Sequence, residues 1–456
     1  MPTEAGASLL EDTLVKGLSR GLSWAKNFAM VGLAAAFFTT PVAAQDDPYA
    51  TADELGLMQG FPPPEDKRVN RSNGLFGVPF NRWSYQHMRE LFPTANIPAS
   101  LTPRPIALAI DGGIERLTYK REDGSEVDFY TYLKETYTDA FVVVHGDKIV
   151  YERYLNGMNP NAPHQMMSVT KSFAGMFGLM AVAKGYLSED DLVTKYVPEL
   201  EVSGAFSQAT FGQVGDMTAS LDFSEDYADP DSGITQYSKV LGLREAAADE
   251  IPADSIYSYL ATLPKDDAHE NGEVFHYQTP KTDVVNWVTN RATTRSFQQE
   301  LTDLWSKIGA DGETYVLLDR NGTLFAGGGL NATPRNLARF TSMMLNDGKV
   351  DGQVVVPADV IKKLSDGADR DAFKNGPNAA GVMGGGDWSY RAQWWVRHTP
   401  DKEAFSAIGV NGQWIYIDVD RDVAIIKQSS QPEASTNYFD EYNINAFDAI
   451  ISYLTQ

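Results

Sequence analysis

Cysteine is absent from the 456-residue sequence, which excludes disulfide bonds, thiol catalysis and cysteine-based metal sites. Histidine is scarce: there are six, His269 and His276 form the one close pair, and no zinc-binding constellation is visible. The H-E-x-x-H signature of zinc peptidases is missing as well. We therefore expect neither a metal nor a cofactor.

Positive charge is also in short supply. The 38 lysines and arginines face 61 aspartates and glutamates, which gives a formal net charge of −23. Since no cluster of basic residues stands out, nucleic acid is excluded as the main partner. The hydrophobic fraction of 43% and the aromatic fraction of 11% are typical of a globular protein, and the length allows one large domain or two.

Long apolar runs are lacking too. The run at 28–38 follows Arg20 and Lys26, and it is short for a membrane span. The sequence V-A-A that ends at Ala44 resembles the cleavage site of a secretory signal peptide. We expect residues 1–44 to be a signal peptide cleaved after Ala44, which predicts a periplasmic or secreted protein with no stable membrane insertion after cleavage. An uncleaved N-terminal anchor is the alternative.

The rest of the chain divides into a leader and a domain. Residues 45–75 are rich in Asp, Pro and Gly, which favours an extended leader, and residues 76–456 form the expected domain. Two β-rich hairpins, at 141–151 and 414–426, flank a series of helical patterns. The helices are expected at 83–92, from Ser188 to Pro198, at 281–288, at 334–345 and at 442–454. This order predicts an α+β fold, in which an antiparallel sheet is flanked by helices and carries an inserted helical lobe.

The most informative stretch begins with Ser168-Val169-Thr170-Lys171. Apolar residues follow at mostly helical spacing up to Gly185, where a helix normally stops. Residues i and i+3 are neighbours on a helix, so the Lys171 amine can lie beside the Ser168 hydroxyl and take its proton. S-x-x-K alone is a weak signal, because an N-cap serine followed by a solvated lysine gives the same pattern.

Two further motifs follow in chain order. Tyr277-Gln278-Thr279 precedes a helical pattern, and Gly409-Val410-Asn411-Gly412-Gln413 leads into the last hairpin. The order resembles the serine β-lactamase and penicillin-binding superfamily, whose motifs are S-x-x-K, S/Y-x-N and K-T-G. Within it the chain is similar to the 6-aminohexanoate-dimer hydrolases and related carboxylesterases. The shared stretches include M-S-V-T-K-S-F, D-F-S-E-D-Y at Asp222–Tyr227, Q-W-W-V at Gln393–Val396, and G-V-N-G-Q.

The resemblance assigns roles to residues. Ser168 is expected to be the nucleophile that forms an acyl-enzyme, and Lys171 and Tyr277 are the candidates for its base and for the acid that protonates the leaving group. A neutral Lys171 requires its pKa to fall from near 10.4 to about 7, at a cost of about 4 kcal/mol. The backbone N–H groups of Ser168 and Gln413 are expected to form the oxyanion hole. Asn411 and Gly412 are expected near the substrate, where Asn411 orients it or stabilises the turn.

Other features remain open. Tyr277 could instead be a core tyrosine, and the tryptophans at 394, 395 and 414 could line an acyl pocket, although their strand positions favour the core. The acidic cluster at Asp222–Asp229 is interpreted as a solvated face, and His276 as a structural residue.

The third motif departs from the superfamily pattern. Val410 and Asn411 replace the lysine and threonine of K-T-G, and Thr279 replaces the asparagine of Y-x-N. The missing lysine holds the carboxylate of β-lactams in the family. We therefore expect a serine hydrolase acting on a small linear amide or ester. The alternatives are a penicillin-recognising D-Ala-D-Ala carboxypeptidase or β-lactamase, and a non-catalytic cell-wall-binding protein with the same fold.

Overall fold

A computed structural model describes residues 47–121, 123–400 and 402–456. The expected signal peptide, residues 1–44, lies outside the described residues and stays a prediction. Residues 47–456 form one compact unit. No helix among the described residues has both the length and the apolar character that a membrane crossing requires.

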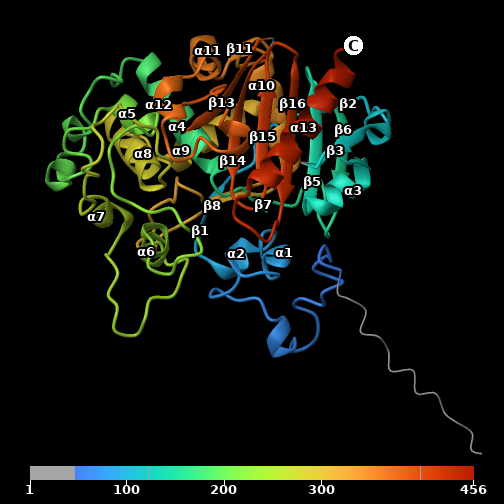
Figure 1. The fold of residues 1–456 in the computed structure, drawn as a ribbon, viewed down its shortest axis with the longest axis horizontal. Helices are drawn as coiled ribbons and strands as arrows, with labels where there is room; N and C mark the ends of the chain where they lie inside the picture. The colour runs from blue at the N-terminus through green and yellow to red at the C-terminus, as the bar shows by residue number, and fades with distance from the viewer. Residues whose placement is uncertain (1–46, 122, 401) are drawn as a thin grey trace, which may run out of the picture. The chain divides into compact units, whose positions relative to one another are not determined.

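The centre of the fold is an eight-stranded sheet (Figure 1). Its neighbouring strands are antiparallel, except that β2 runs parallel to β6 at one edge. Both predicted hairpins are confirmed, as β5–β6 and β15–β16. The strands, in order across the sheet, are β12 (Trp388–Arg391), β13 (Trp394–Thr399), β14 (Lys402–Gly409), β15 (Gln413–Asp418), β16 (Val423–Ser429), β5 (Thr138–His145), β6 (Lys148–Tyr154) and β2 (Ala107–Leu108).

Both faces of this sheet are covered. Alternate side chains along a strand point to opposite faces, so Val142 and Val144 enter one core while Phe141 and Val143 enter another. The first core is closed by α4 (Val169–Ala183), α9 (Phe297–Ile308), α10 (Pro334–Leu345) and α11 (Ala358–Asp366). The second is closed by α3 (Phe129–Glu135) and α13 (Asn437–Leu454), beside the hairpin of β3 (Thr118–Lys120) and β4 (Glu126–Asp128).

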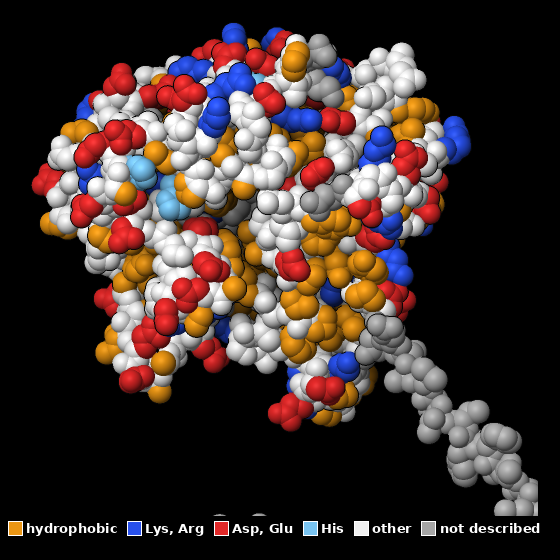
Figure 2. Space-filling model, viewed as in Figure 1, with side chains coloured by type: hydrophobic (Ala, Val, Ile, Leu, Met, Phe, Trp, Pro, Cys, Tyr) orange, Lys and Arg blue, Asp and Glu red, His pale blue; other side chains and the backbone are white. Residues whose placement is uncertain are grey.

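The third core of the molecule belongs to a helical lobe and adjoins α4. This lobe completes the α+β arrangement that the sequence predicts. Its helices are η3 (Val193–Lys195), η4 (Pro198–Val202), α5 (Phe211–Gly215), α6 (Gly233–Val240), α7 (Ile256–Leu260) and α8 (Pro280–Thr293). In Figure 2 acidic side chains gather over this lobe, at the lower left of the visible face. The helix expected from Ser188 to Pro198 is wrong. The Asp191 side chain accepts a hydrogen bond from the Ser188 backbone at 2.9 Å, and this turn delays helical structure until the short η3.

A second, four-stranded sheet has the order β1-β8-β9-β7. Its strands are β1 (Thr94–Ile97), β8 (Thr314–Leu317), β9 (Leu330–Ala332) and β7 (His164–Gln165). Since β7 ends three residues before Ser168, this sheet helps fix where α4 begins. The remaining elements are η1 (Glu65–Lys67), η2 (Ile114–Arg116), α12 (Arg370–Lys374), η5 (Gly381–Met383), β10 (Lys349–Val350) and β11 (Gln353–Val354).

Residues 47–75 lie against the rest of the domain. Leu57, Val69 and Leu75 are buried, and the Ala52 backbone donates a hydrogen bond to the Asn156 side chain at 2.8 Å. The helix expected at 83–92 is divided into α1 (Asn81–Ser84) and α2 (Met88–Leu91). His87 lies at the break, outside any helical φ/ψ region, and its ring stacks on Trp83.

Candidate active site

Ser168 occupies the N-cap position of α4, but its side chain makes no capping hydrogen bond. The turn before the helix is tight, because Met167 has a positive φ of 47°, a conformation that costs a non-glycine residue free energy and is often found at functional sites. Thr170 holds this turn: its hydroxyl donates to the Met167 carbonyl at 2.7 Å and accepts from the Leu330 backbone at 2.9 Å. The Ser168 hydroxyl is therefore not committed to holding the helix.

Lys171 lies one turn into α4 and is 1% exposed, so it is not a solvated lysine. Its Nζ lies 3.0 Å from Ser168 Oγ and also donates to the Gly327 carbonyl. Burial lowers the pKa of the Lys171 amine to about 8, because the charged form loses its hydration. The neighbouring carboxylates of Glu225 and Asp283 act in the opposite direction and raise this pKa.

Asp283, on α8, acts on the Lys171 amine through its charge. Its carboxylate accepts hydrogen bonds from the Tyr237 hydroxyl at 2.8 Å and from the Ala326 backbone at 3.1 Å. Burial raises the pKa of this carboxyl to about 7, while the Tyr237 hydrogen bond and the charge of Lys171 lower it. The acid and the amine thus share a dry environment, in which each one stabilises the charged form of the other.

Tyr277 lies beside Ser168 and Lys171, shortly before α8 begins. The Lys171 Nζ is 5.3 Å from the centre of its ring, and the ring stacks on Trp395 at 5.4 Å. Burial raises the pKa of the Tyr277 hydroxyl and the charge of Glu225 raises it further, whereas a hydrogen bond with Ser168 lowers it. The three motif residues Ser168, Lys171 and Tyr277 therefore meet at one point.

The third motif borders the same point through Gly409, the last residue of β14. A Cβ on Gly409 would lie 3.0 Å from the Ser168 backbone nitrogen and 2.6 Å from the Met166 carbonyl oxygen, so only glycine allows this approach. Gly409 pairs with Gln413, the first residue of β15. The Gln413 side chain is buried and donates to the Asn411 carbonyl at 3.0 Å and to the Ser429 carbonyl at 2.6 Å, which fixes the backbone of the motif.

Asn411 and Gly412 form the turn between these strands, with φ of 62° and 88°. The Asn411 side chain is committed to the protein: its Oδ1 accepts from the Tyr85 hydroxyl at 2.9 Å, and its Nδ2 donates to the Gln431 carbonyl at 2.8 Å. Of the two roles expected for Asn411, these contacts match stabilisation of the turn. Gly412 lines the cavity beside Tyr277 and packs closely on Gln431, where a Cβ would meet the side chain at 2.6 Å.

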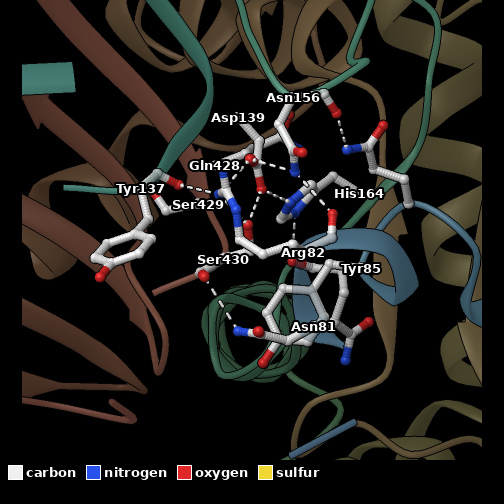
Figure 3. A network of polar contacts seen from close by, with 12 residues as sticks. Asn81, Arg82, Tyr85, Tyr137, Asp139, Asn156, His164, Gln428, Ser429 and Ser430 are labelled. Atoms are coloured by element: carbon white, nitrogen blue, oxygen red, sulfur yellow. Dashed lines mark hydrogen bonds and ion pairs between the residues drawn. The ribbon is translucent and has the colours of Figure 1, made fainter. Parts of the chain in front are cut away.

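A buried polar network supports this turn (Figure 3). Arg82 Nη1 lies 3.0 Å from Asp139 Oδ1, and His164 Nε2 lies 3.0 Å from Asp139 Oδ2. Ser430 donates to the same carboxylate at 2.6 Å and accepts from Arg82 at 2.6 Å. Since Ser430 directly precedes Gln431, the network anchors the segment that holds Asn411.

Two cavities adjoin the motif residues. A slot of about 30 Å³ borders Ser168 and Lys171 and is otherwise mostly apolar, with walls that include Leu75, Phe76, Met167, Ile234, Leu241 and Phe325. A larger cavity of about 320 Å³ lies beyond Tyr277 and Val410. Trp395 and Trp414 line this larger cavity, whereas Trp394 is fully buried in the core and donates to the Ser172 carbonyl at 2.9 Å.

Glu225 was missed by the sequence interpretation, which assigned its cluster to a solvated face. Its carboxylate accepts from the Thr279 backbone at 2.9 Å and from the Thr279 hydroxyl, so it holds the N-terminus of α8 beside Tyr277. Its place in the D-F-S-E-D-Y stretch was the available signal. The backbone carbonyl of His276 accepts a hydrogen bond from Lys281 Nζ at 2.9 Å, and burial lowers the pKa of its ring to about 4. Within the described ranges, no group of three or more His, Asp or Glu side chains is arranged to hold a metal ion.

Comparisons with known proteins identify the family of the chain. The Beta-lactamase family model matches residues 132–447. The 6-aminohexanoate-dimer hydrolase of Paenarthrobacter ureafaciens is 34% identical over 367 residues, which cover 79% of this chain and 88% of that protein. A solved structure from Bacillus anthracis, provisionally described as a 6-aminohexanoate-dimer hydrolase, has a TM-score of 0.75 and 27% identity, covering 86% of this chain and 98% of its own.

More distant structures share the fold alone. A penicillin-binding protein homologue from Caulobacter crescentus has a TM-score of 0.53 at 15% identity, over 72% of this chain and 97% of that chain. The match of the family model to most of the chain, together with the 34% identical relative, establishes the family. The chain belongs to the beta-lactamase family and is a hydrolase of that family.

Proposed function

We propose that this protein is a serine hydrolase that forms an acyl-enzyme on Ser168 and cleaves a small linear amide or ester. The observation that carries the proposal is the 3.0 Å separation of Ser168 Oγ and Lys171 Nζ in a dry site. Burial lowers the pKa of Lys171 to about 8, so a useful fraction of its amine is neutral near pH 7 and accepts the proton of the attacking hydroxyl.

The proposed reaction has two halves. In the first, Ser168 Oγ bonds to the substrate carbonyl carbon, its proton passes to Lys171, and the carbonyl electrons move onto the oxygen. The backbone N–H groups of Ser168 and Gln413 are the candidates for stabilising this oxyanion. The bond to the leaving group then breaks and Tyr277 supplies the proton. In the second half, water attacks the acyl carbon and passes a proton to the Tyr277 phenolate. The ester bond to Ser168 Oγ then breaks, Ser168 Oγ takes back the proton held by Lys171, and the carboxylic acid leaves. Tyr277 is the alternative first base, and in that case the charge of Lys171 stabilises its phenolate.

Two features favour linear amides or esters over β-lactams. The position of the family lysine is Val410, and no described Lys, Arg or His lines the larger cavity, so a substrate carboxylate finds no cation there. In addition, the walls of the slot at Ser168 are mostly apolar, which favours an uncharged group next to the nucleophile. The similarity to the 6-aminohexanoate-dimer hydrolase of Paenarthrobacter ureafaciens supports a linear amide as one substrate class. Export of the mature chain to the periplasm or medium belongs to the same proposal.

The test is the intact mass of the protein after incubation with a fluorophosphonate. We expect a single adduct on the wild type, no adduct on Ser168→Ala, and an unchanged adduct on Ser224→Ala, which removes an exposed serine outside the slot. The hydrolysis of 4-nitrophenyl butyrate should be lost in parallel with the adduct. An unmodified, folded wild type would contradict the proposal and favour a non-catalytic binding protein.

A further inference from the structure

The larger cavity beside Tyr277 carries negative charge that the proposed reaction does not use. Two acidic residues line it, Glu225 and Asp440, whereas no described lysine, arginine or histidine does. Four aromatic residues line it as well, namely Tyr227, Tyr277, Trp395 and Trp414. Carboxylates combined with aromatic faces are suited to a cation, because both attract positive charge.

Asp440 differs from Glu225 in its contacts. Glu225 accepts hydrogen bonds from Thr279 and Tyr227, and is therefore occupied within the protein. For Asp440, the described part of the chain provides no hydrogen bond or ion pair to the carboxylate, although its own backbone N–H donates to the Thr436 carbonyl in the first turn of α13. Asp440 is half-buried and is one of the residues that line the cavity.

The positive group that affects Asp440 from within the protein is Lys427 on β16. The Lys427 amine is fully buried and directs its hydrogen bonds elsewhere, to the Thr136 carbonyl at 3.2 Å and to Ser429 Oγ at 2.5 Å. Burial raises the pKa of the Asp440 carboxyl to about 7, and the charge of Lys427 opposes this only in part. A cation entering the cavity supplies the partner that the carboxylate lacks.

We propose that Asp440 selects substrates whose leaving group ends in an ammonium group, which lies in the cavity between Asp440 and the aromatic rings. The inference rests on the proposed function, in which Tyr277 protonates the leaving group. Because Tyr277 lines this cavity, the leaving group that Tyr277 protonates lies on that side. A leaving group that ends in a carboxylate is disfavoured, since two acidic residues and no described basic residue line this cavity.

The experiment compares three amides of hexanoic acid that differ only in the amine: 1,6-diaminohexane, hexylamine and 6-aminohexanoate. We expect kcat/KM for the wild type to be highest for the ammonium substrate, about tenfold above the neutral one, and lowest for the carboxylate. In Asp440→Asn the ratio of ammonium to neutral substrate should fall towards one. The control Glu441→Gln removes a carboxylate from the same helix, away from the cavity lining, and should keep the wild-type ratio.

A second measurement needs no variant and no amide turnover. Hexylammonium, hexanol and hexanoate are compared as inhibitors of 4-nitrophenyl butyrate hydrolysis by the wild type, and we expect hexylammonium to inhibit most strongly. Equal inhibition, or a wild-type preference for the neutral or the carboxylate compound, overturns the role of Asp440. Such a result leaves the proposed function intact if the fluorophosphonate adduct still forms on Ser168, whereas absence of the adduct removes the proposed function itself.

Discussion

The Tyr85 hydroxyl donates a hydrogen bond to Asn411 Oδ1 at 2.9 Å, although the two residues are 326 positions apart in the sequence. Both side chains are buried. Tyr85 directly follows α1, and Asn411 lies in the turn of the third motif, which borders the Ser168 backbone through Gly409. The N-terminal part of the domain is therefore in direct contact with the turn that shapes the site.

Tyr85→Phe should weaken both the fold and the reaction. The change leaves Asn411 Oδ1 buried without this donor, which costs about 1–3 kcal/mol in the free energy of unfolding. It also loosens the turn before Gln413, so we expect kcat/KM for 4-nitrophenyl butyrate to fall several-fold. Urea unfolding and steady-state kinetics measure the two effects. Tyr186→Phe, at a tyrosine that is 54% exposed, is the control and should change neither; an equally silent Tyr85→Phe would contradict the role of this contact.

The rate should rise with pH as Lys171 loses its proton. Burial lowers the pKa of the Lys171 amine to about 8, and the neutral amine is the form that accepts the Ser168 proton. We therefore expect kcat/KM to rise about tenfold per pH unit below that value and to level off above it. The pKa of Tyr277 is raised, so this group keeps its proton across the same range. A profile that is flat between about pH 5 and 9, or that falls through pH 8, would rule out Lys171 as the base.

The network around Asp139 should be important for stability. Burial raises the pKa of this carboxyl, but Arg82 and the hydrogen bonds of His164 and Ser430 outweigh it, so the pKa lies below its ordinary value. The stabilisation is present above the pKa of the unfolded state and is lost as the pH falls through that of the folded state. Arg82→Gln leaves a buried charge without its partner and should cost about 3–5 kcal/mol in urea unfolding at pH 7.

A control for Arg82→Gln is available at a surface ion pair. Arg89 lies 3.0 Å from Glu313, but the two side chains are 36% and 64% exposed. Since solvent screens such a pair, Arg89→Gln should cost less than about 1 kcal/mol. Similar costs for the two arginine variants would show that the buried network contributes little.

The part of the site that the sequence predicts is the part that is local. Ser168 and Lys171 lie one helical turn apart, so a spacing of three residues is enough to place them together. Tyr277 and the Gly409–Gln413 turn came from the order of motifs in a known superfamily, and the hairpins came from strand periodicity. Helix 334–345 was predicted to the residue because Pro334 begins it and apolar residues recur along it.

Contacts between distant segments that belong to no motif were not predicted. Glu225 reads as one acidic residue in a polar cluster, and its bond to Thr279 depends on how the helical lobe packs against α8. Asp440, at the start of α13, gives no sign in the sequence that it borders the cavity of Tyr277. The helix expected from Ser188 fails for a local reason, because the Asp191 side chain bonds to the Ser188 backbone and favours a turn over a helix.

Glu225→Gln should move the pH profile, because Glu225 acts on Lys171 through charge. The Glu225 carboxylate raises the pKa of the Lys171 amine, so its removal lets this pKa fall and shifts the rising limb of kcat/KM to lower pH. The plateau value of kcat/KM should also fall about 3- to 10-fold, because the side-chain amide of the new glutamine cannot accept both hydrogen bonds of Thr279. Asp226→Asn, at the exposed neighbouring carboxylate, should leave the profile unchanged. If the limb stays in place in Glu225→Gln while the plateau falls, Glu225 positions α8 but does not tune the base.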